Sequence, residues 1–132
     1  MLKRLAFLAL LAVACGGHSP TEPEDTRPRG LLFGVVTIGP NCPVEHQGEP
    51  CPPPPEAFTL RKVLIYDEAR AKLLFTVDLD SRGSWRISLL PGKYTVDLKR
   101  VGIDTASGVP VVVTITASTD VQVDIQVDTG LR

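Results

Sequence analysis

The sequence has few aromatic side chains, histidines and cysteines for its 132 residues. It contains four Phe, two Tyr and one Trp, so its core must be built mainly from Val, Leu and Ile. Its two histidines, His18 and His46, lie in segments rich in Pro and Gly. A Ser–His–Asp arrangement needs an imidazole that is fixed by packing, and neither segment offers that. We therefore predict no catalytic residues, no cofactor and no enzymatic activity.

Clustered positive charge is also missing. The chain has 14 basic and 15 acidic side chains, and loss of Lys3 and Arg4 with a leader would leave 12 basic side chains and a net charge of −3. No run of Lys and Arg interleaved with aromatic residues is present. Because a phosphate-binding surface normally needs such a patch, we exclude nucleic acid as a partner.

Two groups of acidic and imidazole side chains are conceivable metal ligands. Glu45, His46 and Glu49 lie close together in the sequence, but two carboxylates and one imidazole on a Pro/Gly-rich loop are a weak signal. Asp78 and Asp80 resemble the start of a calcium loop, yet the later bidentate Glu of an EF-hand is missing. We expect turn chemistry to explain these aspartates, and we predict no metal site.

Only the N-terminus has a long apolar run. Lys3 and Arg4 precede nine apolar residues at 5–13. A helix that crosses the ~30 Å hydrocarbon core of a bilayer needs about 20 such residues. A short apolar run after positive charges is typical of a signal peptide, and we predict that residues 1–14 form one.

The segment 11–17, LAVACGG, resembles the lipobox of bacterial lipoproteins, with Ala14 as the small residue before Cys15. The resemblance implies cleavage before Cys15 and attachment of a diacylglyceryl group to its sulfur through a thioether, giving two palmitate-type acyl chains, or three after N-acylation. Such a lipid anchor would hold the mature protein on a membrane, and Gly16 in place of Asp favours the outer membrane if the cell is diderm. The alternative is an ordinary signal peptide cut at the same alanine, which would leave a free cysteine.

The number of cysteines in the chain bears on whether Cys42 and Cys51 form a disulfide. An odd thiol in an exported protein calls for an explanation, and a lipid on Cys15 would leave Cys42 and Cys51 as a pair. Segment 39–56 around them contains seven prolines, and proline cannot donate to a strand ladder. We predict a local disulfide there, because the compartment would be oxidising. The loop is then either a stapled connection or a rigid recognition loop.

Residues 15–29 contain three prolines and no large apolar side chain, which predicts a flexible tether. From residue 30 to 128 the sequence alternates apolar and polar residues between turn signals. This pattern predicts an all-β, seven-stranded Greek-key β-sandwich. The predicted strands are 31–38, 58–66, 72–78, 84–89, 93–100, 109–116 and 121–127. A helix over 67–74 is the main local alternative, but we favour a turn and a strand there.

Residues 75–96 resemble the carboxypeptidase regulatory-like, or prealbumin-like, domain. The resemblance is carried by an aspartate turn that ends at Gly83, by Trp85 in the strand that follows, and by the Leu-Pro-Gly-Lys-Tyr run at 90–94. It implies a prealbumin-like sandwich in which Trp85 fills the core and Tyr94 packs beneath its turn. It says little about function.

Two activities of that superfold are not expected. The C-terminus lacks the tetrapeptide of the prealbumin-like hydrolases, and the single asparagine, Asn41, lies in the predicted disulfide loop rather than in a strand that could form a Lys–Asn isopeptide bond.

We therefore expect a membrane-anchored, extracytoplasmic, non-catalytic module that contacts an envelope protein or glycan through its loops. One alternative is a small-ligand-binding or hydrolytic domain, which polar groups converging around His46 or Asp78 would indicate. Another is a structural subunit of an envelope complex, which an uncovered apolar edge such as 109–113 would indicate.

Overall fold

The computed structural model describes residues 26–42 and 51–131. The predicted signal peptide, Cys15, most of the predicted tether, and the candidate ligands Glu45, His46 and Glu49 lie outside the described residues. No helix in the described part of the chain is long and apolar enough to cross a membrane.

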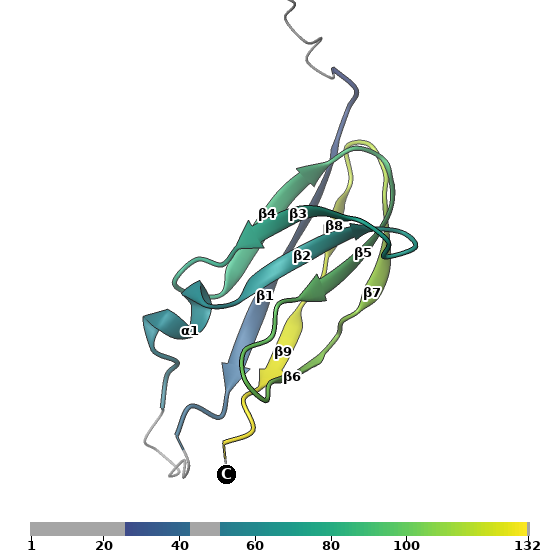
Figure 1. Ribbon diagram of the computed structural model, residues 1–132. Helices are drawn as coiled ribbons and strands as arrows, with labels where there is room; N and C mark the ends of the chain where they lie inside the picture. Colours follow the sequence, from purple (N-terminus) through teal and green to yellow (C-terminus); the bar gives the residue numbers. More distant parts are fainter. Residues whose placement is uncertain (1–25, 43–50, 132) are drawn as a thin grey trace, which may run out of the picture.

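Within these ranges the chain forms nine strands and one short helix, arranged as two facing sheets (Figure 1). The elements are β1 (Gly30–Gly39), α1 (Pro55–Thr59), β2 (Lys62–Asp67), β3 (Leu73–Asp78), β4 (Ser84–Leu89), β5 (Gly92–Leu98), β6 (Thr105–Ser107), β7 (Val111–Ile115), β8 (Asp120–Gln122) and β9 (Ile125–Asp128). One sheet has the order β4-β1-β9-β6, with β8 also beside β1, and the other has the order β3-β2-β5-β7. The predicted all-β sandwich is confirmed, with more strands than the predicted seven.

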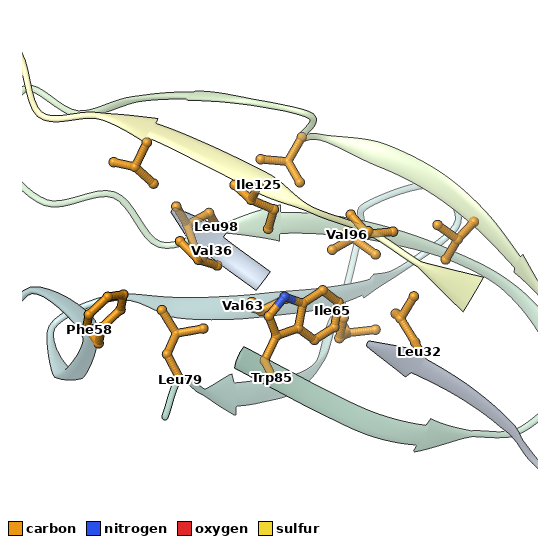
Figure 2. Close-up of a cluster of buried hydrophobic side chains, with 14 of the residues drawn as sticks. Leu32, Val36, Phe58, Val63, Ile65, Leu79, Trp85, Val96, Leu98 and Ile125 are labelled. Atoms are coloured by element: carbon orange, nitrogen blue, oxygen red, sulfur yellow. The ribbon is translucent and has the colours of Figure 1, made fainter. Parts of the chain in front are cut away.

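The core lies between the two sheets and is mainly aliphatic. Its fully buried side chains include Leu32, Ile65 and Leu98, and each comes from an alternating position of its strand. Trp85 is 3% exposed, and Figure 2 shows its ring projecting into the same interior as Ile65. The prediction that Trp85 fills the core is confirmed. The Tyr94 hydroxyl donates to the Leu90 carbonyl across the turn (2.7 Å), as the sequence resemblance implied.

One predicted strand is partly wrong. The sequence predicts strand 58–66, but the structure places Phe58 in α1 and begins β2 at Lys62. Pro55 stands at the start of α1, where the missing N–H and fixed φ of proline favour a helix. One helical turn then directs Phe58 into the core, where it is 6% exposed.

The predicted last strand is divided in two. Val123, Ile125 and Val127 are buried, as the alternation predicts, but the ladder is interrupted at Asp124. The Asp124 carboxylate accepts a hydrogen bond from the Val35 amide (3.0 Å) in place of a main-chain carbonyl. β8 and β9 therefore pair with successive halves of β1, both in parallel.

Side chains of aspartates stabilise two of the turns. Asp67 Oδ1 accepts from the Ala71 amide (2.7 Å), so the segment after β2 is a turn rather than a helix. Asp80 Oδ1 accepts from the Arg82 and Ser84 amides (2.9 and 2.8 Å), which bears out the expected turn chemistry. β6 was not predicted, because three small or polar residues carry no periodic signal.

The two ends of β1 define the two ends of the domain. Its ten residues at about 3.3 Å each span roughly 30 Å. The chain enters at Gly30, where the predicted tether ends, and leaves at Gly39, where the disulfide loop begins (Figure 1). We call these the tether end and the disulfide end.

Candidate functional site

The disulfide end gathers segments that are distant in the sequence (Figure 1). They are the two described legs of the disulfide loop at 40–42 and 51–54, α1, the 79–83 turn, the 99–104 loop and the C-terminal residues 129–131. β1, β3, β5 and β9 all end here, so both sheets position these loops.

The legs of the disulfide loop are fixed at their base. Cys42 and Cys51 form a disulfide with their Cα atoms 6.2 Å apart, which bears out the predicted pairing. Asn41 Nδ2 donates to the carbonyls of Ile38 (2.9 Å) and Cys51 (3.1 Å), so one amide joins the end of β1 to the returning leg. The base of the loop is thus held by a covalent bond and two hydrogen bonds.

A buried ion pair joins α1 to the 99–104 loop. Arg61 Nε and Nη2 donate to the two carboxylate oxygens of Asp104 at 2.8 and 3.0 Å. Arg61 Nη1 also donates to the Ala57 carbonyl in α1 (2.8 Å). The side chains of Arg61 and Asp104 are only 7% and 2% exposed. No local sequence pattern predicts this pair, because its members are 43 residues apart.

The Asp104 carboxyl has a lowered pKa. Burial by itself raises the pKa, but hydrogen bonds from Arg61 and the Val101 amide, with the positive charges of Arg61 and Arg100, outweigh burial. The carboxylate is therefore ionised at neutral pH, and the ion pair is intact.

This shift predicts a pH dependence of stability. A carboxyl whose pKa is lower in the folded state stabilises the fold above its unfolded pKa near 3.8. That contribution is lost as the pH falls through the folded value. We expect the free energy of unfolding of wild type to fall more steeply below pH 4 than that of Asp104→Asn. Urea denaturation between pH 7 and pH 2 measures both. Equal slopes would contradict the assignment, and Asp78→Asn in an exposed ion pair is the control.

The disulfide should stabilise the domain moderately. Closing a loop between cysteines nine positions apart restricts the unfolded chain by roughly 2–3 kcal/mol. We expect Cys42→Ser with Cys51→Ser to lower the free energy of unfolding by that amount, measured by urea denaturation. Wild type in reductant should show the same loss. A double variant as stable as the oxidised wild type would show that the bond adds nothing to stability.

Two open hollows lie near the disulfide end. One, of about 340 Å³, is lined by Pro52, Pro53, Phe58 and Arg82 among others. A larger one, of about 650 Å³, lies over β1, β9 and β6, and its lining includes Thr37, Thr105, Ser107 and Gln126. The linings of the two hollows contain no histidine or cysteine, and the described residues contain no group of three or more His, Cys, Asp or Glu that could hold a metal.

Within the described residues, polar groups do not converge around Asp78, which would have indicated a ligand-binding or hydrolytic site. It lines two shallow hollows of about 410 and 240 Å³. Its side chain is 80% exposed and pairs with Lys62. A carboxylate so placed has the ordinary surroundings of a surface ion pair rather than those of a general acid or base.

A second charged cluster lies on the outer face of β5, where the alternation predicts a polar side chain. The Asp97 side chain is only 2% exposed, because Arg70 and Arg100 both pair with it. Arg70 also lies over the Tyr66 ring, 5.3 Å from its centroid. The sequence did not reveal this burial, because the turn that carries Arg70 folds over the sheet only in the tertiary structure.

Comparisons with known proteins support the fold. Neither a protein-family model nor a curated protein matches this chain. Among solved structures, GBS52, the minor pilin of Streptococcus agalactiae, is similar at a TM-score of 0.52 and 18% identity over 77% of this chain and 45% of that one. A DUF3823 family protein from Parabacteroides merdae is similar at 0.42 and 17% identity over 76% and 46%. This chain thus spans less than half the length of either structure, and the first similarity supports a β-sandwich fold.

Proposed function

We propose that the chain is an extracytoplasmic lipoprotein that is anchored to a membrane through Cys15. Its carboxypeptidase regulatory-like sandwich is non-catalytic, and the disulfide end of this sandwich contacts an envelope protein. The observation that supports the proposal is that residues 26–29 enter β1 at Gly30, whereas the half-cystine Cys42 follows the other end of β1 at Gly39 (Figure 1). In a domain that is tethered at Gly30, the disulfide end is the end farther from the anchor along the chain direction of β1.

Exposed apolar side chains at the disulfide end favour a protein partner over a glycan. Leu60, Ile103 and Leu131 are 56%, 75% and 41% exposed. Leu60 and Ile103 adjoin the two members of the Arg61–Asp104 pair, and a Cβ on Gly130 would lie 2.5 Å from Ile103 Cδ1. All three residues belong to segments of the disulfide end, and we call them together the apical patch. Exposed apolar patches with polar surroundings are typical of protein contact sites.

The lipid anchor is tested by labelling cells with radioactive palmitate. We expect the full-length protein to take up label and to sediment with membranes, and Cys15→Ser to do neither. Cys42→Ser should keep its label and serves as the matched control. A Cys15→Ser protein that is still labelled would contradict the anchor.

The apical patch is tested by placing a photoreactive amino acid at position 103 in the full-length protein expressed in its envelope. The control places the same amino acid at 112, where Val112 is 54% exposed on β7. We expect a discrete cross-linked adduct with a protein from position 103 and none from 112. Failure at 103, or the same adduct from both positions, would contradict a partner at the disulfide end.

A further inference from the structure

We infer that the four prolines at 52–55 form a rigid polyproline II ligand for an aromatic-lined groove on the partner protein. This inference rests on the proposed function, because it names the part of the disulfide end that the partner binds. The prolines connect the half-cystine Cys51 to α1 and lie outside the two sheets (Figure 1). We call them the proline rod.

The backbone of the proline rod is extended in the polyproline II form. A proline ring fixes φ at about −65°, and a residue that precedes a proline is kept at a ψ of about +120 to +160°. Both conditions apply to Pro52, Pro53 and Pro54. The φ of −66° and the ψ of 155° at Pro54 agree with them. The rod is therefore a left-handed helix with about three residues per turn.

The threefold turn divides the prolines of the rod into ridges. Pro52 and Pro55 are three positions apart, so they share one ridge, and both are exposed. Pro54 is exposed on a second ridge. Pro53, on the third ridge, is half-buried and lines the hollow of about 340 Å³ beside Phe58. One ridge thus faces the domain, and two ridges of apolar rings face outward.

Both ends of the proline rod are fixed, so its shape is set before a partner binds. At its start, Cys51 is bonded to Cys42, and the Cys51 carbonyl accepts a hydrogen bond from Asn41 Nδ2 (3.1 Å). At its end, the Pro54 carbonyl accepts from the Ala57 amide in α1 (2.9 Å). A ligand that is already rigid in its bound conformation loses little entropy on binding.

The proline rod offers hydrogen-bond acceptors but no main-chain donors, because proline has no N–H. A strand of another protein therefore cannot form a full ladder with it. No hydrogen bond within the described residues reaches the carbonyls of Pro52 and Pro53. A partner must supply donors to these carbonyls and flat apolar surfaces that fit between the proline rings. Trp and Tyr side chains supply both, and aromatic-lined grooves recognise polyproline II segments in this way.

The sheet edge that the sequence suggested as an interaction surface is less suitable. An uncovered apolar edge was expected at 109–113, but Val109 and Val113 are only 8% and 7% exposed. The inward side chains of this edge are therefore already covered. The proline rod, by contrast, exposes apolar rings on two of its three ridges.

Photo-cross-linking beside the proline rod tests the inference. A photoreactive amino acid replaces Glu56, the exposed residue that follows the rod, in the full-length protein expressed in its envelope. We expect a protein adduct, and we expect mass spectrometry to place it on a groove that contains Trp or Tyr. An adduct from position 103 without one from position 56 would overturn the inference and leave the proposed function standing. The absence of adducts from both positions would overturn both.

Alanine substitutions compare an outward ridge of the rod with the ridge that faces the domain. Pro52→Ala removes a ring from an outward ridge. Pro53→Ala is the matched control, because it restores one N–H and loosens the same rod but removes the half-buried ring. We expect Pro52→Ala to lower the adduct yield from position 56 at least about fivefold and Pro53→Ala to lower it less than about twofold. Equal yields from the two variants, each with wild-type circular dichroism, would refute the proline rod as the ligand.

Discussion

Replacing Arg61 by Ala is expected to lower the free energy of unfolding by about 3–5 kcal/mol, because the substitution leaves the buried Asp104 carboxylate without its partner. The pair is bidentate and both side chains are almost completely buried. Removing one member keeps the desolvation cost of the other and cancels the attraction that offset it. Urea denaturation of the mature protein at pH 7 measures the loss.

The matched control for Arg61→Ala is Lys62→Ala. Lys62 also pairs with an aspartate, but its side chain is 34% exposed and that of Asp78 is 80% exposed. Exposed ion pairs contribute about 0–1 kcal/mol. Equal losses in the two variants would contradict the account of a buried, uncompensated charge. A double change of Arg61→Met and Asp104→Leu should recover much of the loss, because no charge is then left buried.

Gly34→Ala is expected to destabilise the domain by about 3 kcal/mol or more, or to prevent folding, because no space exists for a side chain there. A Cβ at Gly34 would lie 1.7 Å from the Val123 carbonyl oxygen and 2.6 Å from its carbon. Both are main-chain atoms at the break between β8 and β9, so the chain itself would have to move. Thermal and urea denaturation of the purified variant measure the effect.

The control for this substitution is Gly39→Ala at the far end of the same strand. A Cβ at Gly39 would meet no atom within 4 Å, so its stability should change by less than about 1 kcal/mol. A Gly34→Ala protein as stable as Gly39→Ala would show that β8 and β9 do not pack against β1 as described.

Local patterns predicted much of the fold. Strand 84–89 coincides with β4, because Trp85, Ile87 and Leu89 alternate with polar residues between two clear turns. The division of the last strand could not be predicted, since it depends on Asp124 reaching Val35 across the sheet. α1 was missed because Phe58 fits a strand pattern, and the effect of Pro55 depends on which backbone conformation the chain adopts.

The candidate site was predictable only in part. The cysteine count indicated the Cys42–Cys51 pair, and the proline content indicated that the surrounding segment is not a regular strand. The Arg61–Asp104 pair and the apical patch join residues that are far apart in the sequence. No local pattern encodes such contacts, because the two sheets bring those residues together only in the folded domain.

The central claim is that the proposed lipid anchor joins the domain at the Gly30 end of β1, opposite the disulfide end. It is tested most directly by energy transfer in proteoliposomes that contain the acylated protein and an acceptor-labelled lipid. A donor is attached either to Lys93→Cys at the tether end or to Glu56→Cys in α1 at the disulfide end. We predict clearly stronger transfer to the lipid from position 93. Equal transfer from both positions, or stronger transfer from position 56, would contradict the account.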